Sequence, residues 1–366
     1  MKTDPSETSF EDTITEEILE STLLTTNINT ESNLSALFTN KTTIFDKKTT
    51  TLKFSNSVGS STSGTFKSST QLITNSYGKL ESEWIINTTN SAILAIYKND
   101  LIIVNNSHFG FFDLQTGASK SFYEHDLLEP CVFGVIFNER LVIGDCFNLT
   151  LNIWYIDKLI DQSTKILQVN SRYKFQCLTV LINGDLAIGW NDNVYDIVIL
   201  DSYKGSQKYT LVGHNDKVNQ ILQRNDEYII SCSIDKAVII WDSSGSLIKK
   251  IEYQESVISI AISNYLFAVG LADKVIEVIH LKNGKIINSF QAHQQPLCKH
   301  QCLIYLGDQS LLSASLDKTL KIWNPDFNSL NTTIFLHTTD VEQLFFKNDL
   351  LFSRSSAEII KWSTAE

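Results

Sequence analysis

The sequence predicts an all-β fold in which seven small sheets stack about a common axis and close into a ring. Short runs rich in Val, Ile and Tyr alternate with Asn/Asp-rich turns over most of the chain, a pattern typical of strands joined by tight turns. A similar pattern recurs about every 40 residues. One such unit cannot bury both of its own faces, so the repeat predicts a single domain of stacked units.

The clearest unit spans residues 213–242. It opens on a Gly-His pair, continues through two apolar runs, and ends with the turn residue Asp235 and the pair Trp241-Asp242. These features, at these distances from one another, resemble the WD40 repeat of the WD-repeat β-propeller family. The resemblance implies that each unit forms one blade of a β-propeller.

Seven positions are equivalent to the closing Trp, and each is large, apolar and placed at the end of a β-rich run. They lie 38 to 46 residues apart: Phe112, Trp154, Leu200, Trp241, Ile279, Trp323 and Trp362. An Asn, Asp or Ser precedes each of them in a turn, since short polar side chains tolerate tight turns. The sequence therefore predicts a seven-bladed WD40 β-propeller over residues 80–366.

We expect three inner strands in each blade, taken in order along the chain. They are 93–97, 101–104 and 109–114; 132–137, 141–143 and 149–154; 177–181, 185–188 and 194–200; 218–222, 228–230 and the run ending at 241; 257–262, 266–269 and 275–279; 302–306, 311–315 and 320–323; 341–346, 350–352 and 358–362. Many are continuous apolar runs, as expected where neighbouring blades cover both faces of a sheet.

An N-terminal strand is expected to close the ring. Residues 83–87 resemble the outer strand that precedes each later blade, such as 247–251, whereas the chain ends on 358–362 with no outer strand after it. Pairing the first strand with the last removes an exposed sheet edge. This is the family's usual closure, and it makes Trp84 the apolar anchor of the last blade.

Residues 1–79 form an extension of different composition. They are rich in Ser, Thr and Asn, which predicts a largely disordered segment because too little apolar surface is available to offset the ordering entropy. Phe10, Ile14 and Ile18 share one helical face. This fits either a helix that docks on a partner or a transient helix in a solvated tail.

The resemblance also implies a buried hydrogen-bonded relay in two blades. Its members would be His214, Ser231 (or Ser233), Asp235 and Trp241 in the fourth blade, and His293, Ser313 (or Ser315), Asp317 and Trp323 in the sixth. Ser, His and Asp are also the components of a hydrolase triad, but the family's relay is structural. The pattern is degenerate elsewhere: His125 and His337 lack a full set, and Ile279-His280 replaces Trp-Asp in the fifth blade.

No metal or cofactor is expected. Cys298, His300 and Cys302 alternate along one predicted strand and could contribute to a zinc site, but a structural site needs four ligands. We therefore interpret them as core residues. The six cysteines show no framework spacing, which predicts reduced side chains in a protein of the cytoplasm or the nucleus.

The expected binding surface is the face that carries the loops before each inner strand and the turns before each closing strand. Large or charged residues at those turns are the candidate contacts: His108, Phe147, Trp190, Lys217, Lys236, Lys274, Lys318 and Arg354. Trp190 stands where the other blades have Ser233 and Ser315, and Trp and Arg are frequent in binding hot spots. The alternative is that Trp190 packs against the adjoining blade.

The formal net charge is −11, and the few arginines form no basic stripe, which argues against nucleic-acid partners. No apolar run is long enough to predict a membrane span. With no catalytic candidate, we expect a non-enzymatic scaffold that binds protein or peptide partners as a monomeric propeller within a complex. The alternative is a substrate receptor of a ubiquitin ligase. Such members often carry Trp-Asp-x-Arg after a blade, whereas 241–244 and 323–326 lack the Arg, and no F-box-like segment precedes residue 80.

Overall fold

The computed structural model describes the second of two units into which the chain divides, residues 1–46 and 47–366. The described residues are 53–56, 68–77, 80–87 and 93–364, apart from gaps at 105–107, 125–126, 128–129, 138, 157–164, 225–226, 264, 282–283, 299–300, 328 and 348–349. The predicted helical face of Phe10, Ile14 and Ile18 therefore lies outside the described residues, as does His125.

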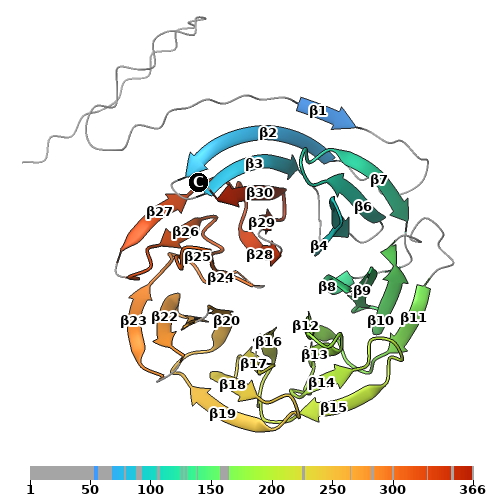
Figure 1. Ribbon diagram of the computed structural model, residues 1–366, viewed down its shortest axis with the longest axis vertical. Helices are drawn as coiled ribbons and strands as arrows, with labels where there is room; N and C mark the ends of the chain where they lie inside the picture. Colours follow the sequence, from blue (N-terminus) through green and yellow to red (C-terminus); the bar gives the residue numbers. More distant parts are fainter. Residues whose placement is uncertain are drawn as a thin grey trace, which may run out of the picture. The chain divides into compact units, whose positions relative to one another are not determined.

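Seven antiparallel sheets follow one another around a ring (Figure 1). The first three are β4 (Ile93–Tyr97), β5 (Asp100–Val104), β6 (His108–Asp113) and β7 (Ser119–Glu124); β8 (Pro130–Phe137), β9 (Arg140–Asp145), β10 (Thr150–Tyr155) and β11 (Lys165–Asn170); β12 (Phe175–Val180), β13 (Leu186–Trp190), β14 (Ile197–Leu200) and β15 (Gln207–Leu211).

The next three sheets repeat the same order from the inner to the outer strand. They are β16 (Val218–Gln223), β17 (Ile229–Ser233), β18 (Ala237–Trp241) and β19 (Leu247–Glu252); β20 (Val257–Ile262), β21 (Leu266–Leu271), β22 (Val275–His280) and β23 (Ile286–Gln291); β24 (Leu303–Tyr305), β25 (Leu311–Ala314), β26 (Leu320–Trp323) and β27 (Leu330–Ile334). The last sheet contains β28 (Val341–Lys347), β29 (Leu350–Ser355), β30 (Glu358–Thr364), β3 (Leu80–Asn87), β2 (Ser68–Tyr77) and β1 (Lys53–Asn56). The predicted all-β, seven-bladed propeller is confirmed.

Burial changes from the middle to the outside of each blade, and the sequence follows it. All six residues of β9 and all five of β17 are buried, because neighbouring blades cover both faces of these strands. The outer strand β19, with the sequence Leu-Ile-Lys-Lys-Ile-Glu, is instead exposed at its start and at its end. The continuous apolar runs therefore mark the middle strands of the blades.

The ring closes through β3, as predicted. This strand pairs with β30 from Leu80 opposite Thr364 to Asn87 opposite Glu358. Trp84 is fully buried, its ring centre lies 5.9 Å from that of Phe352 in the last blade, and its indole N–H donates to the Leu114 carbonyl of the first blade at 3.2 Å. Trp84 thus joins the last blade to the first.

The structure differs from the prediction at the boundary of the extension. Within the segment assigned to a largely disordered extension, β2 pairs with β3 and β1 pairs with β2. These strands cover the outer edge of β3, which would otherwise present unpaired backbone groups. The sequence of β2, Ser-Ser-Thr-Gln-Leu-Ile-Thr-Asn-Ser-Tyr, is too polar to signal a strand by its apolar pattern.

Candidate functional site

The fourth blade holds a hydrogen-bonded relay of four side chains. The Nδ1 atom of His214, in the loop before β16, lies 3.0 Å from Asp235 Oδ2, and its Nε2 atom lies 2.8 Å from Ser231 Oγ. The Trp241 indole N–H donates to the same hydroxyl oxygen at 2.9 Å. The relay therefore links the inner loop, the β17–β18 turn and two strands of one blade.

The sixth blade repeats this geometry with His293, Ser313, Asp317 and Trp323. The distances are 2.9 Å from His293 to Asp317, 2.8 Å from His293 to Ser313 and 2.9 Å from Trp323 to Ser313. Ser233 and Ser315 are not members of the relays. Their hydroxyls donate to loop carbonyls instead, at 2.9 Å from Ser233 to Asp216 and 2.8 Å from Ser315 to Pro296. Of the two alternatives in each blade, the structure thus places the first in the relay.

The relay carboxylates are ionised at neutral pH. Burial disfavours the charged form of Asp317, but hydrogen bonds from His293 and Thr319 outweigh burial and hold the pKa of this carboxyl well below its usual range. Burial lowers the pKa of His293, and Asp317 offsets this only in part. The neutral imidazole therefore donates from Nδ1 to Asp317 and accepts at Nε2 from the serine hydroxyl.

The same arrangement explains why these Ser-His-Asp sets do not resemble a working triad. Ser231 and Ser313 are fully buried, and each hydroxyl oxygen already accepts an indole N–H. A substrate carbonyl cannot reach a nucleophile in that position. The geometry supports a structural role, in which the relay holds the loop, the turn and the strands in register.

A third relay lies in the seventh blade, where we predicted that His337 lacks a full set. That prediction is wrong. His337 Nε2 lies 2.7 Å from Ser353 Oγ, the Trp362 indole N–H donates to the same oxygen at 2.8 Å, and His337 Nδ1 lies 3.3 Å from Glu358 Oε2. The longer Glu side chain reaches the histidine from the first residue of β30. The sequence signal for it was the closing Trp362, but Ser353 lies nine residues before it, whereas ten residues separate Ser and Trp in the other two relays.

The relays also define one face of the propeller. Because His214 and Asp235 touch, the loops between blades and the turns between the second and third strands lie on the same side. We call this side the top face. Among the described residues of these loops and turns, four large apolar ones are exposed: Phe147 (67%), Val212 (66%), Ile234 (36%) and Phe335 (77%). Only Phe147 was predicted.

Several other predicted contacts on the top face are engaged within the protein. The side chains of Lys236 and Lys318 are exposed, but their Nζ atoms donate to the carbonyls of Gln254 at 2.7 Å and Thr338 at 3.2 Å. Lys236, Lys274 and Lys318 occupy the same position in the turns of three different blades. Each has a positive φ, of 66°, 75° and 67°. The first and last of these lysines thus connect turns to the following loops.

The remaining predicted contacts are less exposed than expected. Arg354 is buried and forms an ion pair with Glu342 at 3.0 Å. His108 is half-buried, and its Nε2 atom lies 3.8 Å from Glu124 Oε1. Lys217 is also half-buried. Trp190 is only 8% exposed and belongs to the core between the second and third blades. The alternative of packing against the adjoining blade therefore describes Trp190.

The third blade has apolar residues at two of the relay positions, those of the tryptophan and the serine. Compared through strand register, Leu200 takes the place of the relay tryptophan and Ile188 that of the relay serine. Trp190 takes the place of the serine two residues later, and Ser171 that of the relay histidine. No hydrogen-bonded relay of the kind described above can form from this set.

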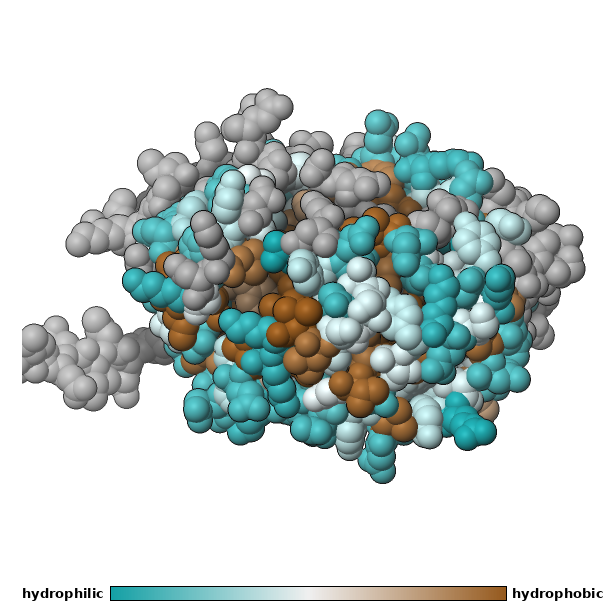
Figure 2. Space-filling model, turned by 60° about the horizontal axis from the view of Figure 1, so that its bottom comes forward, coloured by the Kyte–Doolittle hydropathy of each residue, from teal (hydrophilic) through white to brown (hydrophobic). Residues whose placement is uncertain are grey.

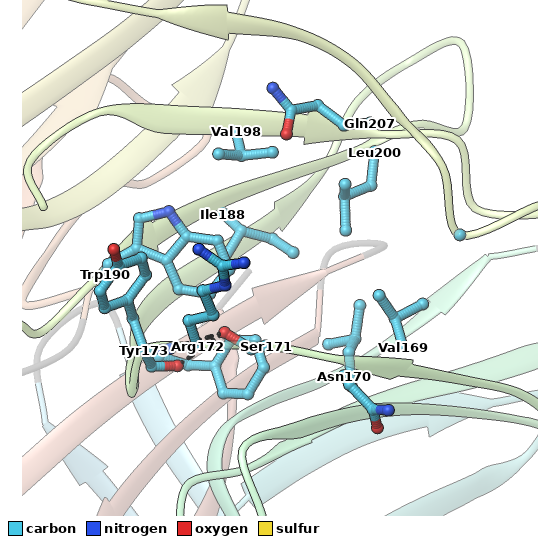
Figure 3. A pocket seen from close by; sticks show the side chains of 13 residues that line it. Val169, Asn170, Ser171, Arg172, Tyr173, Ile188, Trp190, Val198, Leu200 and Gln207 are labelled. Carbon is cyan, nitrogen blue, oxygen red and sulfur yellow. Dashed lines mark hydrogen bonds between the residues drawn. The ribbon is translucent and has the colours of Figure 1, made fainter.

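A cavity of about 290 Å³ lies at these positions, between the second and third blades. Figure 3 shows side chains from both blades directed toward it. Its walls are Leu151, Val169, Phe175, Ile188, Trp190, Val198 and Leu200, and the polar residues around it are Asn170, Ser171, Arg172, Tyr173 and Gln207, with Gly205 at one end. The Trp190 ring lies 5.4 Å from Phe175 and 6.1 Å from Tyr173. No pattern in the sequence predicted this cavity.

A further apolar surface lies on the outer strands. Figure 2 brings forward the side of the ring that carries β19, and apolar side chains gather there among hydrophilic ones. The exposed apolar residues of the neighbouring outer strands are Leu247, Ile248, Ile286 and Ile287. In β19, Lys249 comes directly after Ile248. A charged residue on an outer strand discourages the addition of another strand at this exposed edge.

Among the described residues, no group of three or more His, Cys, Asp or Glu is arranged to hold a metal ion. Cys298 and Cys302 are buried and form no disulfide bond, and burial raises the pKa of the Cys302 thiol. His300 lies outside the described residues. Cys146 takes part in a disulfide bond, which differs from the expectation of six reduced cysteines. The part of the chain that the structure describes also contains no apolar helix of membrane-spanning length.

Comparisons with known proteins agree with the repeat and the fold. The family model described as WD domain, G-beta repeat, matches residues 205–242 and 284–324. Nuclear distribution protein PAC1 of Saccharomyces cerevisiae (strain YJM789) is 26% identical over 223 residues, which cover 53% of this chain and 44% of that protein. WD repeat-containing protein 82 of Drosophila melanogaster is 28% identical over 150 residues, which cover 38% of this chain and 46% of the relative.

WD repeat-containing protein 89 homolog of Dictyostelium discoideum is 32% identical over 142 residues, or 38% of each chain. Each match thus spans less than half the length of the relative. Among solved structures, the computationally designed Ika8 protein superposes with a TM-score of 0.57 at 16% identity, covering 75% of this chain and 97% of that one. At this identity the likeness shows the fold alone.

Proposed function

Because this chain carries WD40 repeats on a seven-bladed β-propeller, we propose that it is a non-enzymatic scaffold whose top face binds protein or peptide partners. The observation that carries the proposal is the WD40 repeat itself, and the exposed apolar residues Phe147, Val212, Ile234 and Phe335 are the candidate contacts on that face. Loops and turns held on a rigid scaffold are a common place for binding residues.

The relays support the same conclusion from the inside. They use the polar groups that could carry chemistry to hold loops and turns in place, and the turns then present their remaining side chains outward. We place the chain as a single propeller within a larger complex, in the cytoplasm or the nucleus. The role of a ubiquitin-ligase substrate receptor stays a prediction from sequence, since no specific feature of the described residues favours it.

Partner capture with matched variants tests the scaffold function. Phe335→Ala and Phe147→Ala remove exposed rings from the top face, whereas Tyr265→Ala removes a ring that is 69% exposed on the opposite face, in the turn between β20 and β21. We expect cross-linking mass spectrometry to show partners that the wild type and Tyr265→Ala retain and that the top-face variants lose. Equal partner sets for all four proteins would contradict a top-face site.

A further inference from the structure

The cavity between the second and third blades combines apolar walls with donor groups that have no acceptor among the described residues. We propose that it binds an acidic peptide segment, with one apolar side chain of the peptide inside the cavity and a neighbouring carboxylate at Arg172. The proposal rests on the scaffold function above and deepens it, since it names a second site on the ring and the chemistry of the partner.

The size of the cavity follows from the residues of the third blade. Leu200 stands where the fourth, sixth and seventh blades have a relay Trp, and Ser171 stands where they have a relay His. Both replacements are smaller. The resulting space of about 290 Å³ is near the lower limit of ligand pockets, about 300 Å³. It therefore suits one Leu or Phe side chain.

The far end of the cavity is closed by backbone. Gly205, between β14 and β15, has a φ of +68°, and a Cβ atom there would lie 2.5 Å from Val169 Cγ2 of the second blade. Only glycine allows both this conformation and this approach without strain. The β14–β15 turn thus packs directly on β11 and bounds the cavity.

The polar groups around the cavity include three hydrogen-bond donors, which suit a ligand that carries hydrogen-bond acceptors. Trp190 is more than nine-tenths buried, and its indole N–H has no hydrogen-bond acceptor among the described residues. The Tyr173 hydroxyl and the exposed Arg172 guanidinium likewise have no partner there, and no Asp or Glu lines the cavity. Figure 3 shows Arg172 extending in the direction of Trp190. The cavity therefore carries a positive charge and donors without a matching anion.

A peptide satisfies these groups together. Its carboxylate would accept from the Arg172 guanidinium, whose planar fork matches two carboxylate oxygens. A peptide carbonyl would accept from the Trp190 indole N–H, which donates to no group of the described residues. Trp, Tyr and Arg are also the residue types that dominate binding hot spots. The apolar walls would take the side chain between these two polar contacts.

Fluorescence anisotropy with defined peptides tests the proposal. The full chain would be titrated into the labelled, capped hexapeptide Gly-Asp-Asp-Leu-Asp-Gly and two counterparts, one with Ala in place of Leu and one with Lys in place of each Asp. We expect the acidic Leu peptide to bind at least tenfold more tightly than either counterpart. Equal affinities, or no binding of the acidic Leu peptide, would overturn the proposal.

Three variants locate the binding. Leu200→Trp fills the cavity with the side chain that other blades carry, and Arg172→Glu reverses its charge; each should weaken the acidic Leu peptide at least tenfold. Arg224→Ala, a substitution in the fourth blade, should leave the affinity unchanged. If Leu200→Trp does not fold, as a thermal melt would show, Arg172→Glu decides alone. Unchanged affinity in Arg172→Glu would refute the site.

Two comparisons distinguish a peptide from a small anion and the cavity from the top face. If N-acetylaspartate competes with the peptide at equal affinity, the site takes a small anion and the peptide proposal is wrong. If no acidic peptide binds while Phe335→Ala still loses partners, this inference fails and the scaffold function stands. If neither Phe335→Ala nor Phe147→Ala loses partners while the Arg172-dependent binding persists, the top-face site fails and the cavity stands.

Discussion

Replacing Trp84 by Ala should destabilise the propeller more than any exposed substitution, because this side chain joins the two ends of the ring. Trp84 is fully buried, packs against Phe352 and belongs to the same core cluster as Phe112. Truncating a buried Trp costs about 3–5 kcal/mol. At roughly 2 °C or more per kcal/mol for a domain of this size class, the melting temperature should fall by about 6 °C or more.

The conservative variant separates packing from hydrogen bonding. Trp84→Phe keeps most ring contacts and loses the bond from the indole to the Leu114 carbonyl. That carbonyl also accepts from Lys361 Nζ at 2.8 Å, so it does not become an unpaired buried acceptor. We therefore expect a smaller loss, about 1–2 kcal/mol. Phe335→Ala, at 77% exposure, serves as the control and should change stability by no more than about 0.5 kcal/mol.

Differential scanning calorimetry gives the melting temperatures, and hydrogen exchange shows where the loss occurs. If closure is the role of Trp84, amides of β3 and β30 should lose protection in Trp84→Ala before those of β17, on the other side of the ring. A melting temperature no lower than that of Phe335→Ala would refute the reasoning. A uniform loss of protection would show instead that Trp84 contributes only packing.

Three further outcomes are expected. Ser353→Ala should cost about 2–3 kcal/mol in thermal melts, because it removes the buried hydroxyl that bonds both His337 Nε2 and the Trp362 indole N–H; a loss below about 0.5 kcal/mol would contradict the third relay. Hydrogen bonds from His337 and Thr338 outweigh burial and lower the pKa of Glu358 from 4.5 to about 2. Its contribution should therefore be complete above about pH 5 and be lost as the pH falls from about 4.5 to about 2, and Glu358→Gln should flatten the melting temperature over this range. Deleting residues 1–79 should lower the melting temperature relative to deleting 1–52, since only the longer deletion removes β1 and β2; equal melts would show that the outer edge of β3 needs no cover.

The ring and its closure could be predicted from the sequence because they depend on features that repeat. The closing residues recur in every blade, and Trp84 lies in a segment that resembles the other outer strands. The strand β2 could not be predicted, since its polar sequence carries no apolar pattern and its pairing with β3 joins backbone groups. Glu358 was missed for another reason. Its longer side chain reaches His337 from the first residue of β30 rather than from the turn before it, so the spacing of the other relays does not point to it.

The cavity was harder to predict, because it depends on two replacements in separate segments. Leu200 stands in place of the relay Trp, and Ser171 stands in place of the relay His. Replacement of the closing Trp by a smaller residue is not enough to form a cavity. In the fifth blade Ile279 replaces Trp, as Leu200 does in the third. There, however, Tyr253 stands four residues before β20, at the place of the relay His, and packs against the core that contains Ile279.

The third blade has Ser171 at that place, and a serine cannot fill the space that the smaller closing residue leaves. Trp190 fills part of it from the next inward-facing position of β13, and the remainder is the cavity. The relay and the cavity are therefore alternative uses of the same place in a blade. In the fourth, sixth and seventh blades a hydrogen-bonded relay occupies this place. In the fifth blade Tyr253 packs there beside Ile279. In the third blade the small Ser171 beside Leu200 leaves room for a side chain of a partner.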